Sequence, residues 1–526
     1  MMQWNLEQRT TKISQLQRDE YDLLIIGGGI TGAGILLDAV SRGLKVLLVE
    51  KNDFASGTSS RSTKLIHGGL RYLKQLEVKI VRETGQERAI AYKNAPHLVL
   101  PEKMLLPIQK GGTYGRFTTS IALKVYDWLA GVKGEDKRKM LSKEQTLQEE
   151  PLLNPDHLKG SGFYSEYRTD DARLTLEIIK TAVSRGGDAL NYLKVEGLIY
   201  DEKGSVNGAT LHDLLSGNEY ELKAKQVINA TGPWSDEIRE MDKSMNNKRL
   251  HLTKGVHIVF DHGRFPLNHS VYFDVKGGRM VFAIPRGKVT YVGTTDTNYH
   301  QQKDNPEVTL EDVNYLLDAA NNMFPSLGLK INDVKSSWAG LRPLIHEDGK
   351  SPSELSRKDE VFLSKTGLIT IAGGKLTGYR LMAKKVVDEV AQRLGIDKKC
   401  TTDQIKINGF PEQGLATELA KKMSSDEDLI GYLIHNYGQQ SVDLTGLDQD
   451  LILAEAKFAI QNEMCLNCYD FFVRRTGRMY FDIDSVRTSK DKVGKLFATH
   501  YNWSEDQLKK ELNRVDEEIT KRSVFK

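Results

Sequence analysis

Three glycines near the start of the chain have the spacing of a dinucleotide-binding turn. Gly27, Gly29 and Gly32 form a G-x-G-x-x-G pattern that follows an apolar run. In such a turn the first glycine permits the tight bend, the second lets the backbone approach a pyrophosphate, and the third lets helix and strand pack closely. Glu50 ends the next apolar run, about 20 residues on, where a carboxylate accepts hydrogen bonds from an adenosine ribose. The pattern therefore predicts a dinucleotide site with its phosphates at a helix N-terminus.

This turn is expected to lie inside a βαβ unit. Residues 21–26 and 45–49 are short apolar runs, typical of strands that are buried on both faces. Between them, residues 30–41 carry apolar side chains at helical spacing and are followed by a glycine, which favours a helix. Strand, helix, second strand and terminal acid agree with one another, which a glycine-rich loop arising by chance would not require.

Two later apolar runs also end in glycine. Residues 226–231 are followed by Gly232, and residues 368–372 by Gly373 and Gly374. Because the carboxyl ends of parallel strands meet at one edge of a sheet, these ends are expected to face one extended ligand. A fingerprint at the start of a long chain, with such strand ends after it, is typical of flavoproteins and favours FAD over NAD.

Composition narrows the class of protein. The 526 residues, 39 % of them hydrophobic, suit two or three globular domains. The net charge of only +3 does not favour nucleic acid as a partner. Cys465 and Cys468 form a C-x-x-C, but neither a second pair nor a nearby histidine completes a zinc set, so no metal is expected. The polar N-terminus is unlike a signal peptide, and no run of about 18 apolar residues predicts a membrane span, so a cytoplasmic location is expected.

A long motif at residues 57–73, GTSSRSTKLIHGGLRYL, is specific enough to indicate a family. The chain resembles the FAD-dependent glycerol-3-phosphate dehydrogenases of the aerobic type, within the wider D-amino-acid-oxidase-like group of flavoproteins. The other motifs that carry the resemblance are GGGITGAG at 27–34, TDDARL at 169–174, NATGPW at 229–234, KGVHIV at 254–259, GTTD at 293–296, GLRPL at 340–344 and GGKLTGYR at 373–380.

The resemblance implies a reaction and an electron acceptor. The reaction is oxidation of sn-glycerol 3-phosphate to dihydroxyacetone phosphate in glycerol catabolism, by hydride transfer from C2 to N5 of FAD. A membrane quinone would reoxidise the FAD. In the oxidase alternative, oxygen does so and hydrogen peroxide is released. Oxidases usually carry an extra insertion, for which the chain has no clear counterpart. An amine or amino-acid oxidase is a further alternative, which the KLIHGGLRYL and GLRPL motifs disfavour. A non-enzymatic FAD protein is another, which the set of basic and histidine pocket candidates disfavours.

The resemblance also implies which residues contact FAD, bound without a covalent link. Residues 58–64 are expected to wrap the pyrophosphate and isoalloxazine, and residues 373–377 to lie at the pyrimidine edge of the flavin. The full expected set is Gly27, Gly29, Ile30, Thr31, Gly32, Glu50, Thr58, Ser59, Ser60, Lys64, Leu65, Val195, Gly232, Gly373, Gly374, Leu376 and Thr377.

The substrate phosphate needs fixed cations. Arg342 in GLRPL is expected to bind it, because the planar guanidinium fork suits phosphate. By resemblance, Arg71 and Lys375 are further basic groups of the pocket, and Tyr72 is a neighbouring donor. Lys375 and Arg342 are also expected to take part in catalysis, Lys375 by stabilising negative charge on the reduced ring.

A general base must take the proton of the C2 hydroxyl, and three histidines are candidates. His257, in KGVHIV, is favoured because imidazole has a suitable pKa range. Its alternation with two apolar neighbours also fits a side chain that only packs on a strand. His67, in IHGG, is the rival, and His346 is third.

A membrane contact is possible without a spanning helix. Residues 115–132 place apolar and aromatic side chains at helical spacing, with cations close behind. Such a helix can lie in a bilayer interface, although the pattern alone favours a helix packed on the protein's own core. With quinone as acceptor, the protein is expected to rest peripherally on the cytoplasmic face of the membrane. A homodimer is a further possibility.

The expected fold is α/β plus α. A Rossmann-like FAD-binding domain carries an inserted antiparallel-sheet substrate domain and is followed by a helical C-terminal cap domain. Residues 1–20 form a polar extension. The discontinuous FAD-binding domain spans 21–395, with insertions at about 77–190 and 245–345, and the cap spans 396–526.

Overall fold

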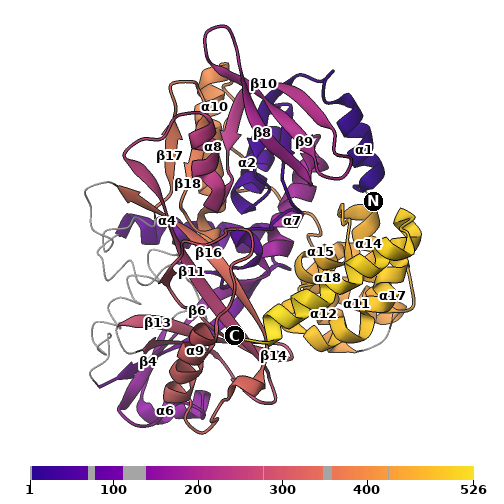
Figure 1. Cartoon of the computed structure of the whole chain (residues 1–526). Coiled ribbons are helices and arrows are strands. Elements are labelled where there is room, and N and C mark those ends of the chain that lie inside the picture. Colours follow the sequence, from indigo (N-terminus) through magenta and orange to yellow (C-terminus); the bar gives the residue numbers. More distant parts are fainter. Residues whose placement is uncertain are drawn as a thin grey trace.

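The computed structural model describes residues 3–68, 78–110, 138–275, 278–347, 358–423 and 426–525. Two sheets form most of the molecule, and a helical C-terminal domain lies beside them, with the N-terminus next to it (Figure 1). The α/β plus α fold class is therefore confirmed.

The first sheet holds the glycine-rich strand ends. Its order is β17-β18-β10-β1-β2-β7, parallel from β18 to β7, with β17 antiparallel at the edge. Strands β8 and β9 extend β10 as an antiparallel ribbon. The bounds are β1 Tyr21–Ile26, β2 Val46–Val49, β7 Asp188–Leu190, β8 Leu193–Tyr200, β9 Val206–Asp213, β10 Glu219–Asn229, β17 Glu360–Leu363 and β18 Ile369–Ala372.

Three helices cover this sheet, α2 (Ile30–Ser41), α7 (Asp171–Val183) and α10 (Tyr379–Leu394). Gly34 of α2 lets α10 approach closely, because a Cβ there would lie 3.2 Å from the Cβ of Ala383. Helix α7 and strand β7 lie inside the 77–190 range expected to be an insertion, yet β7 pairs with β2. Their apolar side chains complete the core of the FAD-binding sheet.

The second sheet is built mainly from the segments predicted to form the substrate domain. Its order is β15-β11-β14-β13-β12-β4-β6-β3, with β16 on β11 and β5 on β6. Strands β12, β13 and β14 form an antiparallel meander. The bounds are β3 Leu65–Ile66, β4 Val99–Gln109, β5 Lys139–Leu141, β6 Leu158–Thr169, β11 Lys248–Asp261, β12 Ser270–Val275, β13 Arg279–Arg286, β14 Val289–Gly293, β15 Thr297–Asn298 and β16 Val334–Glu347.

Short helices connect and cover the two sheets. A capping box formed by Thr309 and Asp312 begins α9. The helices are α4 Val78–Asn94, α6 Lys143–Glu149, α8 Ser235–Met241 and α9 Leu310–Met323, and the 3₁₀ turns are η1 Thr58–Ser60, η3 Gly232–Trp234, η4 Ile331–Asp333 and η6 Leu376–Gly378.

The C-terminal domain is helical and is bound to the N-terminal segment. The backbone N–H of Trp4 donates to the carbonyl of Gln461 at 3.2 Å, and that of Met464 donates to Trp4 at 2.8 Å. The elements are α1 Leu6–Gln15 at the N-terminus, then α11 Leu415–Lys422, α12 Glu427–Tyr437, η7 Gly438–Gln440, α13 Ser441–Leu444, α14 Leu451–Asn462, α15 Cys468–Asp470, the π-helical turn η8 Phe471–Arg475, α16 Arg478–Phe481, α17 Ile483–Tyr501 and α18 Glu505–Ser523.

None of the helices in the described ranges has both the length and the apolar character that crossing a membrane requires. The predicted interfacial segment 115–132 lies outside the described residues, as do Arg71 and Tyr72.

Candidate active site

The turn between β1 and α2 has a backbone that only glycine can form. Gly27 has φ +112°, and a Cβ there would lie 2.6 Å from the carbonyl oxygen of Ala230 on the neighbouring strand. A Cβ at Gly32 would overlap the carbonyl oxygen of Gly27. Gly29 precedes α2 without a side chain, and Ile30 and Thr31 lie in the first turn of this helix, whose N-terminus is the kind of site that favours a phosphate.

Glu50 is held in one orientation at the end of β2. One carboxylate oxygen accepts from the backbone N–H of Gly28 at 2.8 Å, and the other accepts from the N–H of Asn52 at 3.0 Å. Burial raises the pKa of this carboxyl. Strand β8 begins beside it, because the N–H of Leu193 donates to the Glu50 carbonyl at 2.9 Å, and this brings the buried Val195 to the same edge of the sheet.

The loop at residues 58–60 joins the two sheets at this turn. The Ile30 N–H donates to Ser59 Oγ at 2.9 Å, and Thr58 Oγ1 donates to the carbonyl of Leu341 on β16 at 2.7 Å. The hydroxyl of Ser60 is buried and has no hydrogen-bond partner among the described residues. Buried polar groups are normally hydrogen-bonded, so a buried hydroxyl without a protein partner fits a group that contacts a ligand. Glycine cradle, oriented acid and hydroxyl loop therefore fit a dinucleotide.

Lys64 is paired within the protein. Its ammonium forms an ion pair with Asp171 and donates to the carbonyl of Ser60 at 3.1 Å, and the side chain is almost fully buried. Asp171 also accepts from the hydroxyl of Ser62 at 2.7 Å. The buried Lys64–Asp171 pair thus anchors the 58–64 loop through Ser60 and Ser62. Leu65 follows as a buried residue of β3.

The end of β18 brings a second glycine-rich turn to the site. Gly373 has φ +74°, and a Cβ there would lie 3.2 Å from Ile345 on β16. Lys375 precedes η6, where Leu376 begins the turn. Thr377 clamps the peptide of His67, accepting from its N–H and donating to its carbonyl, both at 3.1 Å. Gly374 (φ +84°) and Gly232 (φ +57°) complete the backbone turns at these strand ends.

Arg342 lies on β16, and its side chain extends over Gly255 of the neighbouring strand β11. Its guanidinium donates to Thr294 Oγ1 at 2.8 Å and to the Thr295 carbonyl at 3.1 Å, with Asp296 at 3.2 Å. A Cβ at Gly255 on the paired strand would overlap this guanidinium. The side chain is 30 % exposed, so it can reach a ligand.

His257 lies on the same face of this sheet but is enclosed. It pairs in register with Trp338, and the two rings stack at 4.6 Å. Its Nε2 lies 3.0 Å from Thr63 Oγ1, its Nδ1 has no hydrogen-bond partner within the described part of the chain, and the residue is 1 % exposed. Burial, with the Arg342 charge, lowers its pKa well below the usual value. The enclosed ring fits the packing interpretation of its apolar alternation.

His67 is the imidazole that the structure brings to the η6 turn. Burial, together with the charges of Lys375 and Arg88, lowers its pKa to about 3, so the ring is neutral near pH 7. His346 is farther along β16, in register with Arg249. The sequence alone did not assign roles to Asp171 or Thr63, although TDDARL and the 57–73 motif include them.

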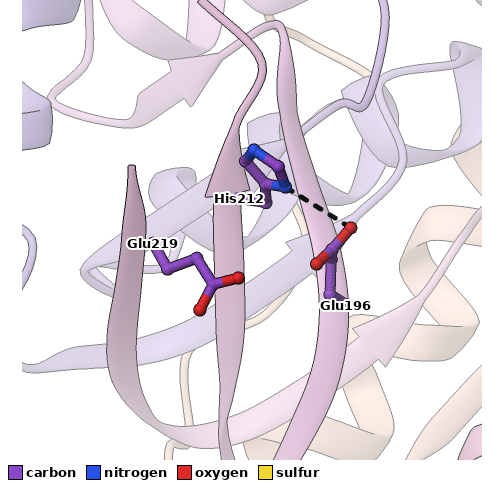
Figure 2. A group of neighbouring side chains, drawn as sticks. All are labelled: Glu196, His212 and Glu219. Carbon is purple, nitrogen blue, oxygen red and sulfur yellow. Dashed lines mark ion pairs between the residues drawn. The ribbon is translucent and has the colours of Figure 1, made fainter. Parts of the chain in front are cut away.

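A cluster of possible metal ligands lies elsewhere, on the exposed β8–β9–β10 ribbon. Glu196, His212 and Glu219 point toward one another there (Figure 2), with their ligand atoms within 4.8 Å. Lys194 lies 2.9 Å from Glu196, and His212 lies 3.5 Å from the same carboxylate. Because Lys194 already supplies a cation, these surface ion pairs explain the cluster.

Substituting Gly29 tests the dinucleotide cradle. We expect Gly29→Ala to weaken FAD binding about tenfold, because the new methyl would occupy the backbone approach to the pyrophosphate. Its Cβ would lie 3.1 Å from Ser59 Oγ, so the protein should still fold. The measurement is the dissociation constant for FAD from flavin fluorescence. Gly263→Ala, where a Cβ meets nothing within 4 Å, is the control. Equal affinity in both variants would contradict the cradle.

Buried imidazoles predict a loss of stability in acid. Burial is the largest cause that lowers the pKa values of His67, His97 and His435 to about 3. The unfolded state, with a pKa near 6.5, then binds more protons than the folded state between about pH 6.5 and 3, so stability falls as pH falls. Each imidazole contributes about 1.4 kcal/mol per pH unit. Urea unfolding of His97→Leu at constant FAD should show a shallower pH dependence than the parent protein, and an unchanged slope would contradict this.

Comparisons with known proteins agree with the geometry. Residues 22–380 match the family described as FAD dependent oxidoreductase, and residues 400–508 match the C-terminal domain of alpha-glycerophosphate oxidase. The chain is 52 % identical to an aerobic glycerol-3-phosphate dehydrogenase of Staphylococcus haemolyticus, covering 96 % of each chain. It is 51 % identical to that of Bacillus subtilis, over 98 % of this chain and 97 % of the relative.

A solved structure is similar over the whole length. The glycerol-3-phosphate dehydrogenase of Bacillus halodurans, complexed with FAD, superposes with a TM-score of 0.85 at 44 % identity, covering 99 % of both chains. An L-alpha-glycerophosphate oxidase of Mycoplasma pneumoniae shares the fold, with a TM-score of 0.58 at 21 % identity over 73 % of this chain and 96 % of that one. The chain therefore belongs to the FAD-dependent oxidoreductases and, among them, to the aerobic glycerol-3-phosphate dehydrogenase family.

Proposed function

We propose that this FAD-dependent enzyme oxidises the C2 hydroxyl of sn-glycerol 3-phosphate to the ketone of dihydroxyacetone phosphate, and that a membrane quinone takes the electrons. Family membership supports the reaction. The single structural observation that carries the substrate class is the position of Arg342. Its guanidinium is partly exposed and lies over Gly255 of the paired strand β11, where a side chain would overlap it.

FAD supplies the two-electron acceptor for the hydride that leaves C2. The residues that would hold it are the Gly27–Gly32 turn, Glu50, the hydroxyls of residues 58–60 and the turn at residues 373–377. Glu50 is preset for the ribose by two backbone N–H groups. Thr377 fixes the peptide of His67 and so joins the flavin turn to the candidate base.

The phosphate of the substrate is a dianion and requires fixed positive charge. Arg342 supplies a planar fork that the Thr294 hydroxyl and the Thr295 carbonyl orient. Lys375 is the second cation of the proposed pocket. Arg71 and Tyr72 stay predictions from the family motif, since both lie outside the described residues.

His67 is the proposed general base. Its neutral ring can accept the proton of the C2 hydroxyl while the hydride leaves C2. Burial is the main cause that lowers the pKa of this ring, and the positive charge at Lys375 adds to it. A bound phosphate dianion would offset the part that comes from Lys375. His257, favoured on sequence, is 1 % exposed behind the 58–64 loop, so its proposed part is to orient Thr63 and Trp338.

The acceptor, the membrane contact through residues 115–132 and a homodimer belong to the same proposal. A quinone dissolves in the bilayer, so an enzyme that reduces it must reach the membrane surface. A peripheral position on the cytoplasmic face accounts for quinone access without a spanning helix.

Turnover with defined substrates and acceptors tests this function. With a soluble quinone analogue, we expect one dihydroxyacetone phosphate per quinone reduced, from sn-glycerol 3-phosphate and not from glycerol. Hydrogen peroxide equal to the ketone formed in air would favour the oxidase alternative. Turnover of an amino acid and none of glycerol 3-phosphate would contradict the substrate.

A further inference from the structure

A buried carboxylate, that of Asp53, joins the predicted FAD-binding part of the chain to the C-terminal domain. Asp53 is fully buried and follows the ribose acid Glu50 by three residues. It accepts from Arg475 at 2.6 and 2.9 Å, from Arg474 at 2.9 Å and from Asn191 at 3.0 Å. Both arginines belong to η8 of the C-terminal domain, more than 400 positions away in sequence.

The loop that carries Asp53 is also the loop that orients the FAD-binding groups. The N–H of Asn52 donates to the Glu50 carboxylate at 3.0 Å, and the hydroxyl of Ser56 donates to it at 3.3 Å. The N–H of Ala55 donates to the carbonyl of Gly28 at 3.0 Å. A displacement of Asp53 would therefore move the partners of Glu50 and of the glycine turn together.

The two arginines are themselves fixed from the C-terminal side. Arg475 donates to the carbonyl of Glu463 at 2.8 and 3.2 Å, and Arg474 pairs with Asp470. Burial alone would raise the pKa of Asp53, but the Arg475 and Arg474 charges hold it below its usual value, so the carboxylate stays ionised. The loop that carries Asp53 has a second link to the C-terminal domain through Trp4. The Trp4 ring stacks on Phe54 at 5.1 Å, and its backbone is hydrogen-bonded to Gln461 and Met464.

A buried ion pair is weak evidence for stability, because desolvation offsets much of the attraction. The ion pair matters more for geometry than for stability, because four hydrogen-bond donors fix the Asp53 carboxylate in one position. We propose that Arg474 and Arg475 are positioning residues for FAD, acting through Asp53 on the loop that sets Glu50 and Gly28. The inference rests on FAD binding at the Gly27–Glu50 segment and assigns the C-terminal domain a part in that site.

A double-mutant cycle on FAD affinity tests this route. The variants are Arg475→Met, Glu50→Gln and the two combined. If Arg475 acts through Glu50, each single variant should weaken FAD binding about tenfold, and the double variant should be little weaker than either single one. Additive losses would overturn the proposal.

Arg478→Met is the matched control. Arg478 is also a largely buried arginine, paired with Glu455 at 2.6 Å, and Asp53 is not among its contacts. Its FAD affinity should match that of the parent, and its combination with Glu50→Gln should be additive. An equal loss of FAD in Arg475→Met and Arg478→Met would mean that only general stability is at work, which would overturn the proposal.

Arg475→Lys covers the case in which Arg475→Met does not fold. It keeps the charge and loses the fork, so FAD affinity should be intermediate; parent-like affinity would contradict the positioning role. Every measurement uses FAD without glycerol 3-phosphate, so a wrong substrate would leave these results unchanged.

Discussion

Replacing Arg342 with alanine is expected to lower kcat/KM for glycerol 3-phosphate about 1000-fold, roughly 4 kcal/mol in transition-state binding. The change removes the guanidinium that would pair with the phosphate dianion, while the FAD-binding turns are on other strands. FAD content should therefore stay at the parent level. Steady-state kinetics with a dye acceptor and the flavin absorbance of the purified protein measure the two quantities.

Two comparisons make the Arg342 result specific. Arg264→Ala removes an arginine that follows the far end of β11 and pairs with Asp333 at 3.0 Å, away from Arg342. This change should alter kcat/KM by less than about twofold. Arg342→Lys should recover only part of the loss, because lysine lacks the planar fork. Unchanged kinetics in Arg342→Ala would remove this residue from the phosphate site.

Replacing His67 with glutamine is expected to lower kcat roughly 100-fold or more, which is the usual size of a lost general base. Glutamine keeps polarity at the site but cannot take the proton of the C2 hydroxyl. The backbone contacts of His67 to Thr377 do not depend on the side chain, so FAD should be retained. Rapid mixing under anaerobic conditions would measure the rate of flavin reduction directly.

His257→Gln separates the two histidines. It should lower kcat less than His67→Gln does, because its ring is stacked on Trp338 and enclosed. A large loss in His257→Gln with normal turnover in His67→Gln would restore the order that the sequence favours.

The glycine turn and its acid could be predicted because local spacing determines them. Gly27, Gly32 and Glu50 lie in one βαβ unit of contiguous sequence, where a positive φ and a close backbone approach exclude other residues. The strand ends at Gly232 and Gly373 followed from the same rule, since parallel strands share an edge. The structure confirms that these strands are parallel neighbours in one sheet.

Contacts between distant segments could not be predicted in this way. Lys64 is expected among the FAD-contacting residues, and nothing in the sequence indicates its ion pair with Asp171 at the start of α7. Asp53 and Arg475 are separated by 422 positions and give no periodic signal. His257 and His67 each follow an apolar residue in sequence, and only the three-dimensional packing distinguishes the enclosed ring of His257 from the ring of His67 at the η6 turn.

Anaerobic addition of glycerol 3-phosphate to the FAD-loaded protein shows whether this substrate reduces the flavin. We expect one equivalent to bleach the visible absorption band of the flavin and to form dihydroxyacetone phosphate, whereas glycerol, which lacks the phosphate, should leave the band unchanged. An unbleached flavin in a folded, FAD-saturated protein would contradict the proposed reaction.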